Sequence, residues 1–246
     1  MSGHSKWKTI KNAKGVTDKR RSALFTKLIR EITVSAKAGG DPDGNPRLRT
    51  AIDNARSQSM PKENIERAIL KGTGDLEGAD YVDVVYEAYG PGGVALMIQA
   101  LTDNATRTVA EVRAKLSRGG GNLGTVNSVA FMFDRKGQIF VDAGGLDEDS
   151  SMEKALEAGA EDFAREDETF IITTAPNDLH AVKAALATAG LVSTQAELAW
   201  IPKSSVPVAG ESAAQLLKLI EGLEDIDDVQ KVDANYEMDE SEMAGA

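Results

Sequence analysis

The sequence of 246 residues contains no cysteine and only two histidines, His4 and His180. Without cysteine, the chain has no disulfide framework, no thiol nucleophile and no cysteine-ligated zinc or iron–sulfur site. Two histidines are too few for a multi-histidine metal centre. We therefore expect no metal site and no cofactor. Hydrophobic residues make up 41% and charged residues 27% of the chain, which is typical of a globular protein with an apolar core.

Long apolar segments are also missing, because no run approaches the roughly 18 residues needed to cross a bilayer. The N-terminal stretch MSGHSKWKTIKNAK is basic but lacks the apolar region of a secretory signal. We expect a cytoplasmic protein with no membrane partner.

A catalytic constellation cannot be assembled from the residues present. The carboxylates between residues 161 and 168 lie in charge runs typical of solvated surface, and neither histidine has the partners of a catalytic triad. Residues 119–124, GGGNLG, fit a dinucleotide-binding glycine pattern, but a helix is expected before them and a strand after them, which reverses the required order. We interpret this segment as a helix-to-strand loop. We expect no catalytic residue, no small-molecule substrate and no enzyme activity.

Positive charge is concentrated at one end of the chain. Residues 1–75 carry 16 Lys and Arg against 8 Asp and Glu, whereas the remaining 171 residues carry 12 against 31. The net charge of −11 therefore combines a basic N-terminal segment with an acidic remainder. An acidic body repels a polyanion, so contact with nucleic acid would be confined to one face of the protein.

Seven of the cations fall within sixteen residues, at spacings suited to successive phosphate contacts. Trp7 lies among them and either stacks on a base or packs against the helices, the second being the interpretation we favour. Further arginines follow on the second expected helix. The candidate nucleic-acid-binding residues are Lys6, Trp7, Lys8, Lys11, Lys14, Lys19, Arg20, Arg21, Arg47, Arg49 and Arg56.

Two other charged segments have open interpretations. Arg107, Arg113 and Arg118 either extend the cationic surface or form ion pairs. The acidic stretch 221–228 is interpreted as solubilising helix-end charge, with masking of the basic segment as the alternative. Aromatic residues are scarce, at 5%, which argues against sequence-specific reading of single strands.

Hydrophobic periodicity predicts an α+β protein. Apolar stripes indicate three helices, over 18–38, from Asn45–Pro46 onward, and from Met60–Pro61 to Gly72. Strands and helices then alternate in about two small split βαβ-like units. The strands are expected at 82–89, 94–101, 128–133, 138–142, 169–174, 193–201 and 229–236, and the helices at 104–116, 150–163, 178–188 and 212–223.

Six longer strings of the sequence are distinctive. They are SGHSKWKTIKNAK, DKRRSALFTKLIREI, AKAGGDPDGNPRLRTAI, MPKENIERAILKG, YEAYGPGGVALMIQALTDNATRT and GNLGTVNSVAFMF. These strings resemble the YebC/PmpR family. The resemblance extends over essentially the whole chain.

The resemblance implies a helical domain at 1–79, an α/β domain at 80–133 plus 206–239, a third domain at 134–205 inserted in the second, and an acidic tail at 240–246. It also implies a probable transcriptional regulator that binds DNA, without a catalytic site or cofactor. Some relatives are translational activators associated with ribosomes, so RNA is the alternative partner. The oligomeric state stays open.

Overall fold

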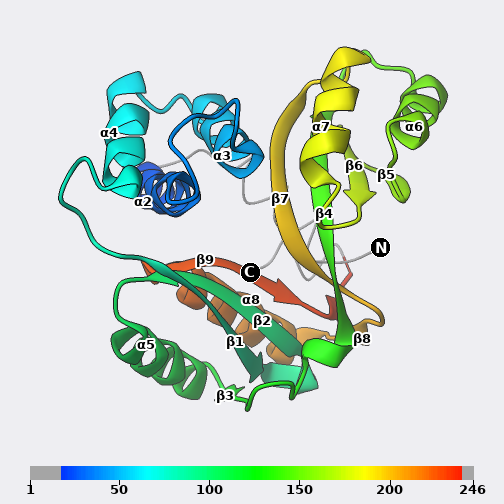
Figure 1. Cartoon of the computed structure of the whole chain (residues 1–246). Coiled ribbons are helices and arrows are strands. Elements are labelled where there is room, and N and C mark those ends of the chain that lie inside the picture. The colour runs from blue at the N-terminus through cyan, green and yellow to red at the C-terminus, as the bar shows by residue number, and fades with distance from the viewer. Residues whose placement is uncertain (1–17, 240–246) are drawn as a thin grey trace. The chain divides into compact units, whose positions relative to one another are not determined.

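A computed structural model describes residues 18–239. In this part of the chain, seven α-helices accompany antiparallel sheets, and the predicted α+β class is confirmed (Figure 1). The described residues form two compact units. The first comprises residues 18–31, 78–134 and 200–239, and the second comprises residues 32–77 and 135–199.

Three helices open the described chain, as predicted. Asn45 caps the second, because its side-chain oxygen accepts a hydrogen bond from the backbone N–H of Leu48 at 3.0 Å and Pro46 occupies the first helical position. Ile32, Val34 and Ala36 at the end of the first helix are buried in the second unit. The three helices are α2 (Asp18–Ala36), α3 (Pro46–Ser57) and α4 (Lys62–Thr73).

The third helix does not end at Gly72, where the sequence predicts its end. It continues to Thr73, and Gly74 adopts the left-handed conformation, with φ of +87°, that terminates a helix. Gly72 is needed for a different reason. A Cβ atom at this position would lie 2.3 Å from the carbonyl oxygen of Thr33, so glycine allows α4 to approach α2 closely.

The first unit is built on a four-stranded sheet of order β3-β1-β2-β9, with antiparallel neighbours. Helices α5 and α8 cover one of its faces (Figure 1). Leu96 and Ile98 of the sheet pack there against Val112, Leu116 and Leu216 of the helices. A short parallel pair, β8-β10, completes the unit. The bounds are β1 (Val82–Tyr89), β2 (Ala95–Thr102), α5 (Ala105–Arg118), β3 (Asn122–Leu123), β8 (Val206–Pro207), α8 (Gly210–Glu224), β9 (Val229–Ala234) and β10 (Tyr236–Glu237).

The second unit contains a sheet of order β5-β6-β4-β7 with two helices beside it (Figure 1). Its core joins Ile139, Phe170 and Ile172 of the strands to Leu179 and Val182. All four strands lie in sequence between β3 and β9, so this sheet interrupts the chain of the first sheet. The bounds are β4 (Phe133–Asp142), α6 (Glu148–Glu157), β5 (Asp162–Glu166), β6 (Thr169–Thr174), α7 (Leu179–Thr188) and β7 (Ser193–Pro202). The predicted domain boundaries after residues 79, 133 and 205 stay a prediction.

Two predicted elements were wrong. The strand expected at 128–133 is a loop followed by the 3-10 turn η2 (Ala130–Met132), because the carboxylate of Glu87 accepts hydrogen bonds from backbone N–H groups that a strand would use in pairing. The helix expected at 150–163 ends at Glu157, since Gly159 has a φ of +96°. Residues 162–166 form strand β5 instead.

Candidate nucleic-acid interface

Seven of the eleven candidate residues cannot be placed. Lys6, Trp7, Lys8, Lys11 and Lys14 lie outside the described residues. Lys19 and Arg20 belong to the first turn of α2, and their side chains also lie outside the described part. The four remaining candidates are Arg21, Arg47, Arg49 and Arg56.

Arg21 is exposed on α2. Its guanidinium lies 5.5 Å from the centroid of the Phe25 ring, one helical turn further along. A cation over an aromatic face at this distance is attracted by the ring quadrupole, which orients the side chain but leaves its charge in solvent. The charge of Arg21 therefore remains available to a phosphate.

On α3, Arg49 and Arg56 differ in how far they are already engaged. The Arg49 guanidinium donates to the carbonyl oxygens of Pro42 at 3.0 Å and Asp43 at 2.9 Å, so it closes the loop that precedes the helix. The Arg56 side chain is 69% exposed, and its guanidinium makes a long ion pair, at 3.9 Å, with the carboxylate of Asp53. An exposed pair of this length contributes little energy. Arg56 is therefore freer than Arg49 to contact a phosphate.

The adjoining side of α3 is packed against α7 and β7 within the second unit. Thr50 Oγ1 and His180 Nδ1 are 2.7 Å apart. Lys183 Nζ donates to Asp53 at 2.5 Å. The Asn54 amide donates to the carbonyl oxygen of Ala196 at 2.8 Å and accepts its N–H at 3.1 Å. This side of α3 is thus not available to a ligand.

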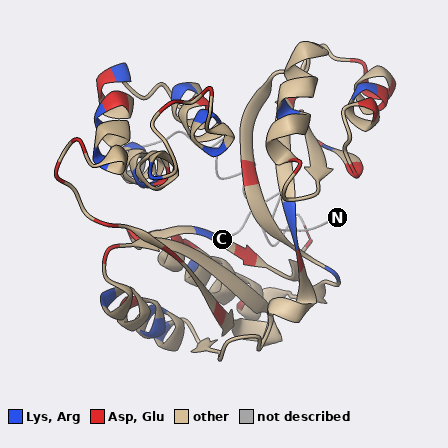
Figure 2. Cartoon of the chain, viewed as in Figure 1, with Lys and Arg blue, Asp and Glu red and all other residues tan. Residues whose placement is uncertain are grey.

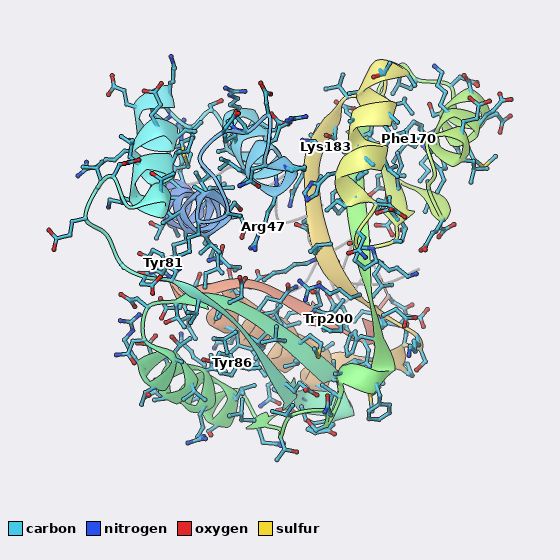
Figure 3. The ribbon with its side chains drawn as sticks, in the orientation of Figure 1. Arg47, Tyr81, Tyr86, Phe170, Lys183 and Trp200 are labelled. Carbon is cyan, nitrogen blue, oxygen red and sulfur yellow. The ribbon has the colours of Figure 1, made fainter. Side chains whose placement is uncertain are left out.

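His180 lies in a cationic environment. Burial, then the charge of Lys183 and then that of Arg47 lower its pKa from the usual value. Arg47 is exposed at the start of α3, and Lys183 belongs to α7 (Figure 3). The neutral imidazole is therefore favoured here. The positive charge at this end of α3 therefore comes from Arg47 and Lys183 and not from His180.

Helix α4 carries charges of both signs (Figure 2). Lys62 lies 3.3 Å from Glu66 one turn along, while Arg67 is exposed. Mixed charges of this kind are typical of a solvated helix face. Helix α4 is therefore a weaker candidate for phosphate contact than α3.

A second cationic surface lies on α5 in the first unit (Figure 2). Of the two interpretations, ion pairing applies to Arg107, which is 2.8 Å from Asp103 and 2.7 Å from Asp228. Arg113 and Arg118 are exposed, and neither has a partner within residues 18–239. The open groove beside α5 has a volume of about 690 Å³, but acidic residues such as Asp225 and Asp227 line it together with the cations and offset their charge.

The acidic stretch 221–228 is not only solvated charge. Asp228 is buried, with its side chain 3% exposed, and lies 2.6 Å from Arg30 of α2. Its second oxygen accepts hydrogen bonds from Thr108, Thr102 and Arg107. Burial alone would raise the pKa of Asp228, but the hydrogen bonds of Thr108 and Arg107 and the charge of Arg30 outweigh it, and the pKa is lowered. The interpretation of this stretch as solubilising charge was therefore wrong for Asp228.

The glycine-rich segment 119–124 follows helix α5, as predicted, but it contains the short strand β3, and the strand expected after it at 128–133 is absent. Its glycines serve packing. A Cβ atom on Gly121 would lie 2.6 Å from the carbonyl oxygen of Tyr89, and one on Gly119 would lie 2.6 Å from Leu219. In residues 18–239 no cluster of acidic or histidine side chains could hold a metal ion. Across that same range no helix is both long and apolar enough to traverse a bilayer.

Both parts of the chain match descriptions of one protein family. Residues 5–75 match "TACO1/YebC protein N-terminal domain" and residues 81–236 match "TACO1/YebC second and third domain". A "probable transcriptional regulatory protein" from Gemmatimonas aurantiaca is 66% identical over 100% of both chains. A protein of the same description from Acidithiobacillus ferrooxidans is 55% identical over 99% of this chain and 98% of its own.

A solved structure has the same fold. The crystal structure of a conserved hypothetical protein from Aquifex aeolicus is 48% identical and superposes with a TM-score of 0.85. The superposition covers 91% of this chain and 93% of that protein. The likeness therefore extends over the N-terminal helices and both sheets.

Proposed function

The chain belongs to the TACO1/YebC family, and from this premise we propose that it regulates gene expression by binding nucleic acid through its basic N-terminal segment, without catalysing a reaction. The relatives named as probable transcriptional regulatory proteins support DNA as the first candidate partner. We propose that it acts in the cytoplasm.

The observation that carries the proposal is the charge asymmetry. The first 75 residues hold 16 of the 28 cationic side chains, on a chain whose net charge is −11. Each phosphate that a cation neutralises releases condensed counterions, which drives binding without any base contact. The exposed Arg21, Arg47 and Arg56 fit this role, and Arg113 and Arg118 add a second place of contact.

RNA is the second candidate, and the packing of α3 favours it. Reading of bases in duplex DNA normally requires a helix or strand that enters the major groove. The side of α3 that carries Thr50, Asp53 and Asn54 is occupied by α7 and β7. A protein that recognises backbone and shape, as many RNA-binding proteins do, needs no such free helix.

Reversal of charge in the basic segment tests the proposal. Lys11→Glu combined with Arg20→Glu should weaken binding to a labelled duplex and to a labelled RNA. It should also lower the slope of log affinity against log salt by about 0.7–0.9 for each lost phosphate contact. The matched control is Lys154→Glu with Lys218→Glu, which changes the net charge equally on α6 and α8. Equal affinities for the two folded double variants would contradict the proposal.

Sedimentation of a cell lysate then separates the two partners. Co-migration with ribosomal particles that RNase abolishes and DNase spares would assign the protein to RNA. Association with fast-sedimenting nucleoprotein that only DNase abolishes would assign it to DNA.

A further inference from the structure

The loop of residues 124–132, between β3 and β4 (Figure 1), is held by a buried carboxylate. Glu87 of β1 is 8% exposed, and its two oxygens accept the backbone N–H groups of Asn127 at 2.5 Å, Val129 at 2.7 Å and Ala130 at 2.8 Å. Burial alone would raise the pKa of Glu87, but these hydrogen bonds outweigh it and the pKa is lowered. The ionised carboxylate therefore fixes the backbone of the loop.

Further hydrogen bonds hold the rest of the 124–132 loop. The N–H of Gly124 donates to the carbonyl oxygen of Glu87 at 2.7 Å. The Tyr89 hydroxyl donates to the carbonyl oxygen of Ser128 at 2.9 Å. Lys203 donates twice, through Nζ to the carbonyl oxygen of Phe131 at 3.1 Å and through its backbone N–H to that of Met132 at 2.9 Å. The loop backbone is thus held by strand β1 and by Lys203.

Two apolar side chains of this fixed loop nevertheless face solvent. Phe131 is 65% exposed and Val126 is 86% exposed, whereas Val129 and Phe133 are buried. Within residues 21–239, Phe131 is the single aromatic side chain in the exposed class. A surface ring on a backbone that is already ordered loses little further entropy when a ligand covers it. The arrangement is that of a preorganised contact.

The surroundings of Phe131 indicate what covers the ring. Lys203 is 51% exposed, and its ammonium lies at the backbone of Phe131 and 3.4 Å from the carboxylate of Asp134. Charged residues are depleted at the core of a protein–protein contact, so the neighbouring Lys203 and Asp134 do not favour a protein partner. An aromatic face next to a cation is instead the combination that binds single-stranded nucleic acid, in which bases stack and phosphates pair.

We propose that Phe131 is a stacking platform for an unpaired nucleobase, with Lys203 beside it to contact the adjoining phosphate. The inference rests on the proposed function, because it adds a contact of the first unit with the nucleic acid that the protein is proposed to bind. Stacking on one ring is tolerant of sequence, since every base has a π face. The scarcity of aromatic residues therefore does not oppose it.

Variants of Phe131 test stacking directly. The probes are a fluorescein-labelled 20-nucleotide RNA, the DNA strand of equivalent sequence, and the duplex of that DNA. Phe131→Ala should weaken binding of a single strand at least about fivefold, and binding of the duplex less than twofold. Phe131→Tyr should retain the wild-type affinity, and Phe131→Leu should behave as Phe131→Ala does. The control is Val192→Ala, which truncates another apolar side chain that is 70% exposed.

A spectroscopic variant adds a readout of the ring itself. Phe131→Trp should gain indole emission that a single strand quenches and the duplex does not. Comparison of the affinities for the RNA and for the DNA strand shows which of the two nucleic acids supplies the unpaired base. Circular dichroism of each variant should match that of the wild type, since the exposed ring contributes little to folding.

The outcomes separate this inference from the proposed function. If the wild type binds neither duplex nor single strand, the proposed function fails and this site falls with it. If the wild type binds but Phe131→Ala binds equally well, only the stacking site is refuted. Full affinity in Phe131→Leu, or equal losses on single strand and duplex, would also refute stacking.

Discussion

Helices α2 and α3 are both anchored to the α/β part of the chain, but by different chemistry. In the first unit, Arg30 of α2 donates to the carboxylate of Asp228 at 2.6 Å, and the two side chains are only 11% and 3% exposed. In the second unit, α3 is held by neutral hydrogen bonds of Thr50 and Asn54 and by an ion pair whose Lys183 and Asp53 side chains are 13% and 43% exposed. One anchor is a buried charge network and the other is a partly solvated polar contact.

This difference determines how much each anchor depends on a single residue. A buried charge is tolerated only while its partners remain, so removal of one partner leaves the other unpaired and desolvated. A pair near solvent is replaced by water at small cost. We therefore expect the attachment of α2 to be lost when either partner of the Arg30–Asp228 pair is removed, and the attachment of α3 to tolerate loss of the Asp53–Lys183 pair.

The largest effect is expected for Asp228→Ala. This change leaves Arg30 buried without its carboxylate and also removes the acceptor of Thr102, Thr108 and Arg107. Loss of one partner of a buried ion pair costs about 3–5 kcal/mol. The free energy of unfolding from urea denaturation should fall by that amount.

Two control variants sharpen the comparison. Asp227 is the exposed neighbour of Asp228, and it accepts a hydrogen bond from Arg30 through its backbone carbonyl oxygen. Asp227→Ala keeps this carbonyl and should lower the free energy of unfolding by less than about 0.5 kcal/mol. Asp53→Ala removes the partly exposed partner of Lys183 and should cost at most about 1 kcal/mol. A cost for Asp228→Ala no larger than that for Asp53→Ala would remove the distinction between the two anchors.

An intermediate effect is expected for Glu87→Gln in the first unit. Here backbone N–H groups rather than cations hold a buried carboxylate, and hydrogen bonds to a charged group are worth about 1.5–3 kcal/mol. The glutamine should lower the free energy of unfolding by about this amount. It should also speed amide exchange at residues 127, 129 and 130 more than in strand β2.

The pH dependence of this stabilisation follows from the lowered pKa of Glu87. The contribution is complete above the ordinary pKa of about 4.3 and is lost as the pH falls through the lower pKa of the folded state. Glu237→Gln, at an exposed position of β10, is the matched control and should leave both stability and exchange unchanged. Unchanged exchange in Glu87→Gln would show that the loop does not depend on the carboxylate.

Local signals in the sequence were sufficient for most elements of the fold. The cap of Asn45 and Pro46, the strand from Val82 to Tyr89 and the class as a whole are confirmed. The sequence could not show that the N–H groups after Asn127 bind a carboxylate on another strand, so 128–133 was wrongly predicted as a strand. Strand propensity is a property of the residues within a segment, whereas the conformation of this loop depends on contacts with Glu87, some forty residues earlier in the chain.

The candidate site was predictable in composition but not in detail. The concentration of cations is visible in the sequence, yet the engagement of Arg49 with the loop before it requires coordinates. The pairing of Arg30 with Asp228 joins positions 198 residues apart, and no local pattern indicates it. Exposure of Phe131 is equally hidden, because an apolar residue within an apolar run predicts burial.

The smallest effect is expected from the titration of His180 in the second unit. Its pKa is lowered by burial and by the charges of Lys183 and Arg47, so the unfolded chain binds a proton more readily than the folded chain. The resulting stabilisation is complete above the ordinary pKa of about 6.5 and is lost as the pH falls from there through the folded pKa. The second unit should therefore weaken at a higher pH than the first, whose buried carboxylates titrate only in stronger acid. Nuclear magnetic resonance should place the pKa of His180 below the ordinary value of about 6.5, and His180→Asn should reduce the fall of the urea midpoint that begins as the pH drops below that value. A pKa at or above 6.5, or an unchanged slope in His180→Asn, would mean that protonation does not disturb the contact between Thr50 and His180.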